Sequence, residues 1–103
     1  MKTIEKKPGC IEATLKIMGD KWTALVLLEL SKQQATFSEI YQALCGISPR
    51  TLSQRLHKLE QENIVTKTCY CEHPPRYQYQ LTQKGKELHG VLRQMANWGA
   101  KYL

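Results

Sequence analysis

The segment from Gly46 to Val65, GISPRTLSQRLHKLEQENIV, carries two different stripes of side chains at the same helical spacing. Leu52, Leu56 and Leu59 recur every three or four residues, which predicts one apolar face of an amphipathic helix. At about 100° per residue, a second and polar stripe lies roughly opposite. Its members are Arg50, Gln54, His57 and Gln61. The leucines therefore belong in a core, and a row of hydrogen-bond donors faces away from it.

The start of this helix is marked by Ser48 and Pro49. A serine hydroxyl accepts a hydrogen bond from an otherwise unpaired amide, and proline at the first helical position loses no hydrogen bond. We expect the helix to extend to about Glu62.

A shorter helix precedes it and ends at about Leu44, because Gly46 breaks it. Either Thr36 or Ser38 is a candidate N-cap, and the spacing of Thr36 and Glu39 matches a capping box. Two helices joined by such a short turn have the layout of a helix-turn-helix.

Upstream, the sequence WTALVLLEL from Trp22 to Leu30 is apolar nearly all round, which is typical of a helix buried at the centre of a domain. Asp20 is its candidate N-cap. Before it, Pro8 and Gly9 are expected to end a loose basic arm. The apolar positions and closing glycine of a first helix then follow: Ile11, Leu15, Met18 and Gly19.

Downstream, IVTKTCYCEHPPRYQYQLT has alternating arms around His73, Pro74 and Pro75, which predicts a β-hairpin with a proline-bearing tip. Thr82 is the candidate cap of a final helix. Its apolar positions form one stripe, wide enough to pack against its own domain and another chain: Leu88, Val91, Leu92, Met95, Trp98 and Tyr102. The predicted fold is mainly α with a small β-hairpin, a winged helix-turn-helix in a single domain over residues 1–103. A chain of 103 residues has a thin core, which favours pairing with a partner subunit.

The charge balance favours a polyanionic partner such as nucleic acid or acidic lipid. The chain has 15 Lys and Arg against 9 Asp and Glu, a net charge of +6. Residues 48–86 contain seven of the cations and three acids, Glu60, Glu62 and Glu72, and none of these acids lies in the N-terminal half of the polar-striped helix. A solvated face without a ligand is the alternative, but such a face more often mixes the two signs.

In a helix-turn-helix the second helix enters the major groove with its N-terminal half nearest the bases. Arg50 and Gln54 are therefore the candidates for base recognition, since arginine pairs with guanine and glutamine with adenine. The other candidate DNA-binding residues on this helix, several of them suited to phosphate contacts, are Ser48, Pro49, Thr51, Ser53, Arg55, His57 and Lys58. On the hairpin they are Lys67, His73 and Arg76, placed for the backbone or the adjacent minor groove.

Four segments, GDKWTALVLLEL, TFSEIYQAL, GISPRTLSQRLHKLEQENIV and PPRYQYQLTQKG, occur in this order between about Cys10 and Trp98. Together they resemble the HxlR-type regulators, a winged-helix family of bacterial transcription factors related to the MarR type. The resemblance implies a homodimer on a pseudo-palindromic operator in double-stranded DNA. It also implies that the first and last helices join the two copies, which places Ile11 and Leu15 in the interface beside the stripe of the final helix.

The resemblance further implies a role for Cys10, because several members of the family respond to quinones, aldehydes or oxidants through one cysteine just before the first helix. A thiol at a helix N-terminus beside Lys6 and Lys7 also favours the reactive thiolate. The family usually has proline after this cysteine, whereas this chain has Ile11. The alternative is a small apolar residue packed at a subunit seam. A pocket for a small-molecule effector beside Trp22 is a further possibility.

The other cysteines suggest no metal site and no cofactor. Cys69 and Cys71 are two apart on a predicted strand, so we expect both on one face. The chain nevertheless lacks the second pair of ligands that structural zinc needs. Cys45 is expected in the core.

No signal peptide or membrane-length apolar run is found, so the expected compartment is the reducing cytoplasm. No motif of hydrolytic or phosphate chemistry occurs, and we do not expect an enzyme. A winged-helix module that binds protein or RNA is the alternative function.

Overall fold

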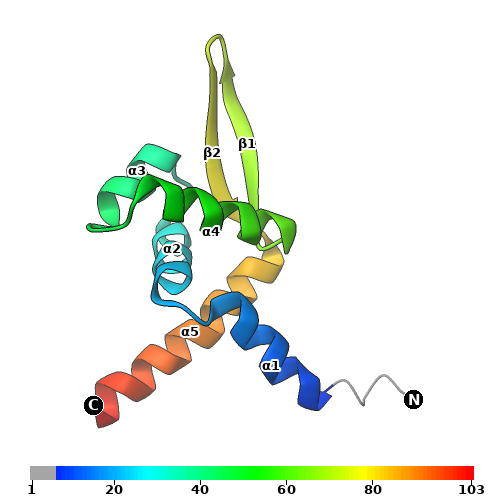
Figure 1. The fold of residues 1–103 in the computed structure, drawn as a ribbon, viewed down its shortest axis with the longest axis vertical. Coiled ribbons are helices and arrows are strands. Elements are labelled where there is room, and N and C mark those ends of the chain that lie inside the picture. The colour runs from blue at the N-terminus through cyan, green and yellow to red at the C-terminus, as the bar shows by residue number, and fades with distance from the viewer. Residues whose placement is uncertain (1–6) are drawn as a thin grey trace.

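The computed structural model describes residues 7–103, with side chains from residue 11 onward, as five helices and one antiparallel hairpin (Figure 1). The elements are α1 (Lys7–Met18), α2 (Lys21–Lys32), α3 (Phe37–Ala43), α4 (Pro49–Gln61), β1 (Val65–Glu72), β2 (Pro75–Leu81) and α5 (Gln83–Tyr102). The predicted order of four helices, a hairpin and a final helix is confirmed. None of these helices combines the length and the apolar content that crossing a bilayer requires.

Each predicted N-cap holds the first turn of its helix. The Asp20 carboxylate accepts from the Thr23 amide at 3.0 Å, and the Ser48 hydroxyl accepts from the Thr51 amide at 3.0 Å. Thr82 caps α5 in the same way. At α3 the cap is Thr36 and not Ser38, because the reciprocal capping box with Glu39 is formed. Local sequence therefore determines where these four helices begin.

The start of α1 differs from the prediction. The helix begins at Lys7, so Pro8 and Gly9 lie in its first turn and not in a preceding arm. Proline is tolerated there because the amides of the first turn have no intrahelical partner in any case.

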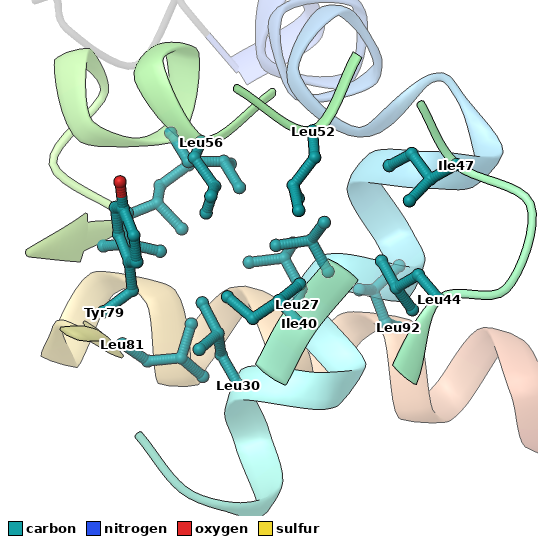
Figure 2. Close-up of a cluster of buried hydrophobic side chains, with 14 residues drawn as sticks. Leu27, Leu30, Ile40, Leu44, Ile47, Leu52, Leu56, Tyr79, Leu81 and Leu92 are labelled. Atoms are coloured by element: carbon teal, nitrogen blue, oxygen red, sulfur yellow. The ribbon is translucent and has the colours of Figure 1, made fainter. Parts of the chain in front are cut away.

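The core is built around α2, in which Val26 and Leu27 are fully buried. Leu52 and Leu56 point from α4 toward Leu27, as Figure 2 shows, and both are at most 1% exposed. The base of the hairpin and α5 close the remaining sides of the cluster through Val65, Tyr79, Leu81 and Leu92. The predicted central helix and the predicted leucine face are both confirmed.

The hairpin is attached to the segment between α2 and α3 as well as to its own neighbours in sequence. The Ala35 amide donates to the Tyr79 carbonyl at 3.0 Å, and the Tyr79 amide donates back at 2.7 Å. Beyond this base, β1 and β2 project from the body as a narrow ribbon (Figure 1). The free ends of α1 and α5 diverge at the opposite end of the molecule. The ribbon and the ends of α1 and α5 therefore present separate surfaces.

Two glycines of α5 provide a matched test of the packing. A Cβ at Gly85 would collide with the backbone carbonyl of Ile64, which is itself held by hydrogen bonds from Thr82, whereas a Cβ at Gly90 would meet nothing within 4 Å. We expect Gly85→Ala to lower the free energy of unfolding by about 1–3 kcal/mol. Gly90→Ala is expected to raise it by up to about 1 kcal/mol, because alanine is the better helix former. Urea unfolding measures both, and a Gly85→Ala protein as stable as the parent would contradict the packing described.

Candidate nucleic-acid interface

The turn between α3 and α4 sets where the polar stripe begins. Leu44 and Ile47 are buried on either side of it, and the Ile47 amide donates to the Leu44 carbonyl at 3.1 Å. Gly46 between them has a φ of +98°, a conformation in which glycine has no steric penalty. The chain thus reverses within a few residues and delivers Ser48 to the start of α4.

The polar stripe of α4 faces away from the core. Arg50, Gln54, His57 and Gln61 are all exposed, whereas the three leucines on the opposite side are at most 1% exposed. Pro49 and Ser53 are also exposed, and Thr51 is half-buried beside the cap. The side chains proposed to touch bases are therefore accessible along the length of the helix.

Arg55 and Lys58 lie on the flank of α4, and both donate hydrogen bonds to other residues of the chain. The Arg55 Nε donates to the Asp20 Oδ1 at 3.2 Å, and the Lys58 Nζ donates to the Lys16 backbone carbonyl at 2.6 Å. Both side chains are half-buried. From the sequence, Arg55 and Lys58 were predicted only as DNA contacts and Asp20 only as an N-cap. Their position in the sequence could have indicated these contacts, because side chains between the polar and the apolar stripe of a helix lie close to a neighbouring element.

The carboxylate of Asp20 accepts three hydrogen bonds. Its Oδ1 accepts from the Thr23 amide and from Arg55, and its Oδ2 accepts from the Thr23 hydroxyl at 2.9 Å. Partial burial acts to raise the pKa of Asp20, but the hydrogen bonds from Thr23 and the charge of Arg55 outweigh burial and hold this pKa below its ordinary value. The group is therefore ionised at neutral pH and tied to α4.

The hairpin presents cations along its length. The Lys67 ammonium lies 4.8 Å from the ring centroid of Tyr77 and 6.0 Å from that of Tyr79, on the face that these three residues share. Burial raises the pKa of the Tyr79 hydroxyl more than the Lys67 charge lowers it. Arg76 and His73 are exposed close to the tip. The tyrosines thus hold one cation in place, and the two tip residues extend beyond it.

The geometry of an exposed polar helix beside a basic ribbon has close counterparts among known proteins. The profile of the HxlR-like helix-turn-helix family matches residues 17–103. YtcD of Bacillus subtilis strain 168, an uncharacterised HTH-type transcriptional regulator, is 31% identical over 93 residues, which cover 90% of this chain and 74% of YtcD. The chain belongs to the HxlR-like helix-turn-helix family.

Two solved structures agree with this assignment. A protein from Enterococcus faecalis V583, described as a transcriptional regulator of the MarR family, matches with a TM-score of 0.85 and 31% identity over 93% of this chain and 87% of that chain. The redox regulator HypR in its reduced form matches with a TM-score of 0.82 and 31% identity over 88% of this chain and 90% of that chain. The winged-helix fold and the function as a DNA-binding transcriptional regulator are therefore confirmed. Because the family consists of transcriptional regulators, the chain is not an enzyme.

In this HxlR-like chain, α1 and α5 carry a large exposed apolar surface. Its members are Ile11, Leu15, Val91, Met95, Trp98, Tyr102 and Leu103, which are 46–97% exposed. A groove of about 340 Å³ between the two helices is lined by Ile11, Thr14, Leu15, Met18 and Val91. Leu88 is half-buried. Leu92, predicted at a dimer interface, is only 7% exposed and packs in the chain's own core, because the apolar stripe of α5 is broad enough to face both ways.

The hairpin cysteines do not share a face. Strand pairing sets Cys69 opposite Tyr77 and Cys71 opposite Arg76, so Tyr70 is an inserted residue that forms a β-bulge. Because neighbours on β2 point to opposite faces and paired residues share one, the two cysteines lie on opposite faces. The expectation of a common face is wrong. Within residues 11–103, no cluster of three or more His, Cys, Asp and Glu side chains is arranged to hold a metal ion.

The remaining two cysteines differ in what the structure describes. Cys45 is exposed, which corrects its expected place in the core: Leu44, the C-cap of α3, takes the buried position, and Cys45 faces outward in the turn. The backbone of Cys10 lies inside α1, as its fourth residue, and not just before the helix as the resemblance implied; its side chain lies outside the described residues.

Proposed function

We propose that this regulator binds a pseudo-palindromic operator as a homodimer, with α4 of each copy in the major groove. The observation that carries the proposal is the exposed polar stripe of α4, which the buried leucines hold away from the core. Arg50 and Gln54 lie in the first two turns, which approach the bases most closely in this motif. We assign base recognition to these two residues. Contacts with the sugar-phosphate backbone of the DNA are assigned to Ser48, Pro49, Thr51, Ser53 and His57.

The hairpin supplies the second contact. Arg76 places an exposed positive charge near the tip of the ribbon, His73 adds a hydrogen-bonding side chain beside it, and Lys67 lies closer to the base. A narrow ribbon with cations near its tip suits the phosphate backbone or the adjacent minor groove.

The proposed partner of the apolar face on α1 and α5 is a second copy of the chain. Monomeric proteins rarely expose contiguous apolar patches of this kind, and a two-fold interface uses the same patch on both subunits. The face lies at the end of the molecule opposite the hairpin, so pairing there leaves both copies of α4 open (Figure 1). DNA binding then requires the α4 helices of the two copies to lie about 34 Å apart, which is one turn of the duplex.

Redox responsiveness through Cys10 is the third part of the proposal. HypR, whose fold this chain shares, is named a redox regulator, and structures of its reduced and oxidised forms both match. The backbone of Cys10 is in the first turn of α1, where the helix dipole favours a thiolate. Such a thiol fits a regulator in the reducing cytoplasm, where we place this protein. An electrophile is then the proposed effector.

The base-recognition assignment is tested on DNA selected from a random duplex pool by the wild-type protein. Arg50→Ala is expected to lose about 1–3 kcal/mol of preference for the selected duplex over a scrambled one, because a bidentate contact to a base is removed. Fluorescence anisotropy measures both affinities. Arg93→Ala, which removes an exposed arginine from α5, is the matched control. A selection that yields no common sequence would instead favour an RNA- or protein-binding module.

The dimer is tested at Met95, which is 54% exposed within the apolar face. Met95→Glu buries a charge in the proposed interface, so we expect sedimentation of a monomer where the wild-type protein sediments as a dimer. Gln94→Glu introduces the same charge at the adjacent exposed position and should leave the dimer intact. A dimeric Met95→Glu protein would show that α5 does not join the two copies.

The sensing role is tested by treating the protein with diamide and measuring its affinity for the selected duplex. Wild-type affinity should change, and Cys10→Ser should abolish the change, because the reactive thiolate is gone. Cys69→Ser removes an exposed thiol of the hairpin and serves as the control. An unaltered response in Cys10→Ser would exclude this cysteine as the sensor and leave DNA binding unaffected.

A further inference from the structure

The junction between α1 and α2 accepts hydrogen bonds from two side chains of α4. The Lys16 carbonyl belongs to the last turn of α1 and accepts from Lys58, and Asp20 caps α2 and accepts from Arg55. The two acceptors are four positions apart in sequence, and the two donors are about one helical turn apart on α4. Between the acceptors, a Cβ at Gly19 would collide with the Leu15 carbonyl, so glycine is required for this close turn. The junction is thus a compact clamp, made by Lys16 and Asp20.

Both contacts of the clamp are favoured electrostatically. Lys58 brings a positive charge to the C-terminal end of α1, where the helix dipole is negative. Asp20 brings a negative charge to the N-terminal end of α2 and also receives the charge-assisted hydrogen bond from Arg55. The side chains of Arg55 and Asp20 are 28% and 39% exposed, so solvent only partly screens their attraction.

The clamp supplies a constraint that the leucine face does not. The buried leucines fix which side of α4 faces the core, but apolar packing is non-directional and opposes small rotations of the helix about its axis less sharply than a hydrogen bond does. On a helix about 10–12 Å wide, a rotation of roughly 20° moves an outward side chain by about 2 Å, enough to break a hydrogen bond to a base. Two tethers on one flank oppose that rotation and so determine where Arg50 and Gln54 point.

We propose that Arg55 and Lys58 are positioning residues, held by Asp20 and by the Lys16 carbonyl, that set the orientation of α4 for base recognition. This inference rests on the proposed function. It has a structural consequence: α1, which carries part of the proposed dimer interface, is connected directly to the helix that reads DNA. A displacement of the end of α1 reaches α4 through the Lys58 hydrogen bond.

The alternative is that both cations simply contact phosphates, and Asp20 separates the two cases. Asp20→Asn keeps an effective N-cap on α2 but removes the charge that holds Arg55. If Arg55 contacts only phosphate, losing a negative charge near DNA should strengthen binding or leave it unchanged. If Arg55 positions α4, affinity for the selected duplex should fall about three- to tenfold while affinity for scrambled DNA does not fall.

The matched control is Glu29→Gln, which makes the same charge change on α2 at a residue paired with Lys32 and remote from the clamp. Affinity for the selected duplex should be retained in this variant.

Arg55→Gln added to Asp20→Asn should cost little further affinity, because the two residues act as one unit. Lys58→Met should weaken binding to the selected duplex without changing its salt dependence, whereas loss of a phosphate contact lowers that slope by about one. An Asp20→Asn protein that binds the selected duplex as tightly as the wild type would overturn the proposal.

A second readout does not depend on DNA and keeps the inference distinct from the proposed function. Hydrogen exchange of the α4 amides should be faster in Asp20→Asn than in Glu29→Gln, because one tether of the helix is lost. If wild-type protein shows no sequence preference, the proposed function fails, and equal exchange in the two variants would then refute the clamp as well.

Discussion

The burial of the leucine face of α4 against α2 is the contact on which the other features depend. Leu52 and Leu59 are completely buried, and Leu27 of α2 is equally inaccessible. Each such side chain contributes about 1.5–3 kcal/mol on burial, a large part of the 5–15 kcal/mol that typically separates folded from unfolded domains. The helix therefore cannot turn these residues outward. Because the polar stripe is on the other side of the same helix, its exposure follows from the core.

Asp20 likewise contributes to two helices, α2 and α4. Its carboxylate starts α2 through the Thr23 amide and holds α4 through Arg55. Its low pKa reflects both sets of hydrogen bonds acting against partial burial. The elements of this small protein are thus connected by a few side chains with more than one partner, which suits a chain whose core is thin.

Features that depend on near neighbours in sequence were predictable. The caps at Ser48 and Thr82, the leucine face and the proline-bearing hairpin all follow from patterns within a few residues, and the structure confirms them. Contacts between distant segments were not predictable in this way. The Arg55 contact spans 35 positions, and the pairing of Ala35 with Tyr79 depends on how α2, α3 and the hairpin pack.

The same limit explains two errors about individual side chains. The inserted residue at Tyr70 leaves no mark in the alternation of β1, so the relation between Cys69 and Cys71 was misjudged. Leu92 belongs to a stripe that is apolar on two sides, and only packing shows which side it faces. The exposure of the polar stripe of α4 was predictable because amphipathic periodicity identifies the exposed side of a helix. The contacts of its residues with DNA stay predictions.

The bulge at Tyr70 gives the outer part of the hairpin a different register from its base. Below it, paired positions follow one register from Val65 and Leu81; above it, the register is shifted by one residue. A bulge increases the local twist and bends the strand that contains it. A change in the length of the outer half would therefore alter how far the ribbon projects without shifting the residues of the inner half, which holds Tyr79 in the core. The single inserted residue, Tyr70, thus marks the boundary between the part of the hairpin that belongs to the core and the part that projects from it.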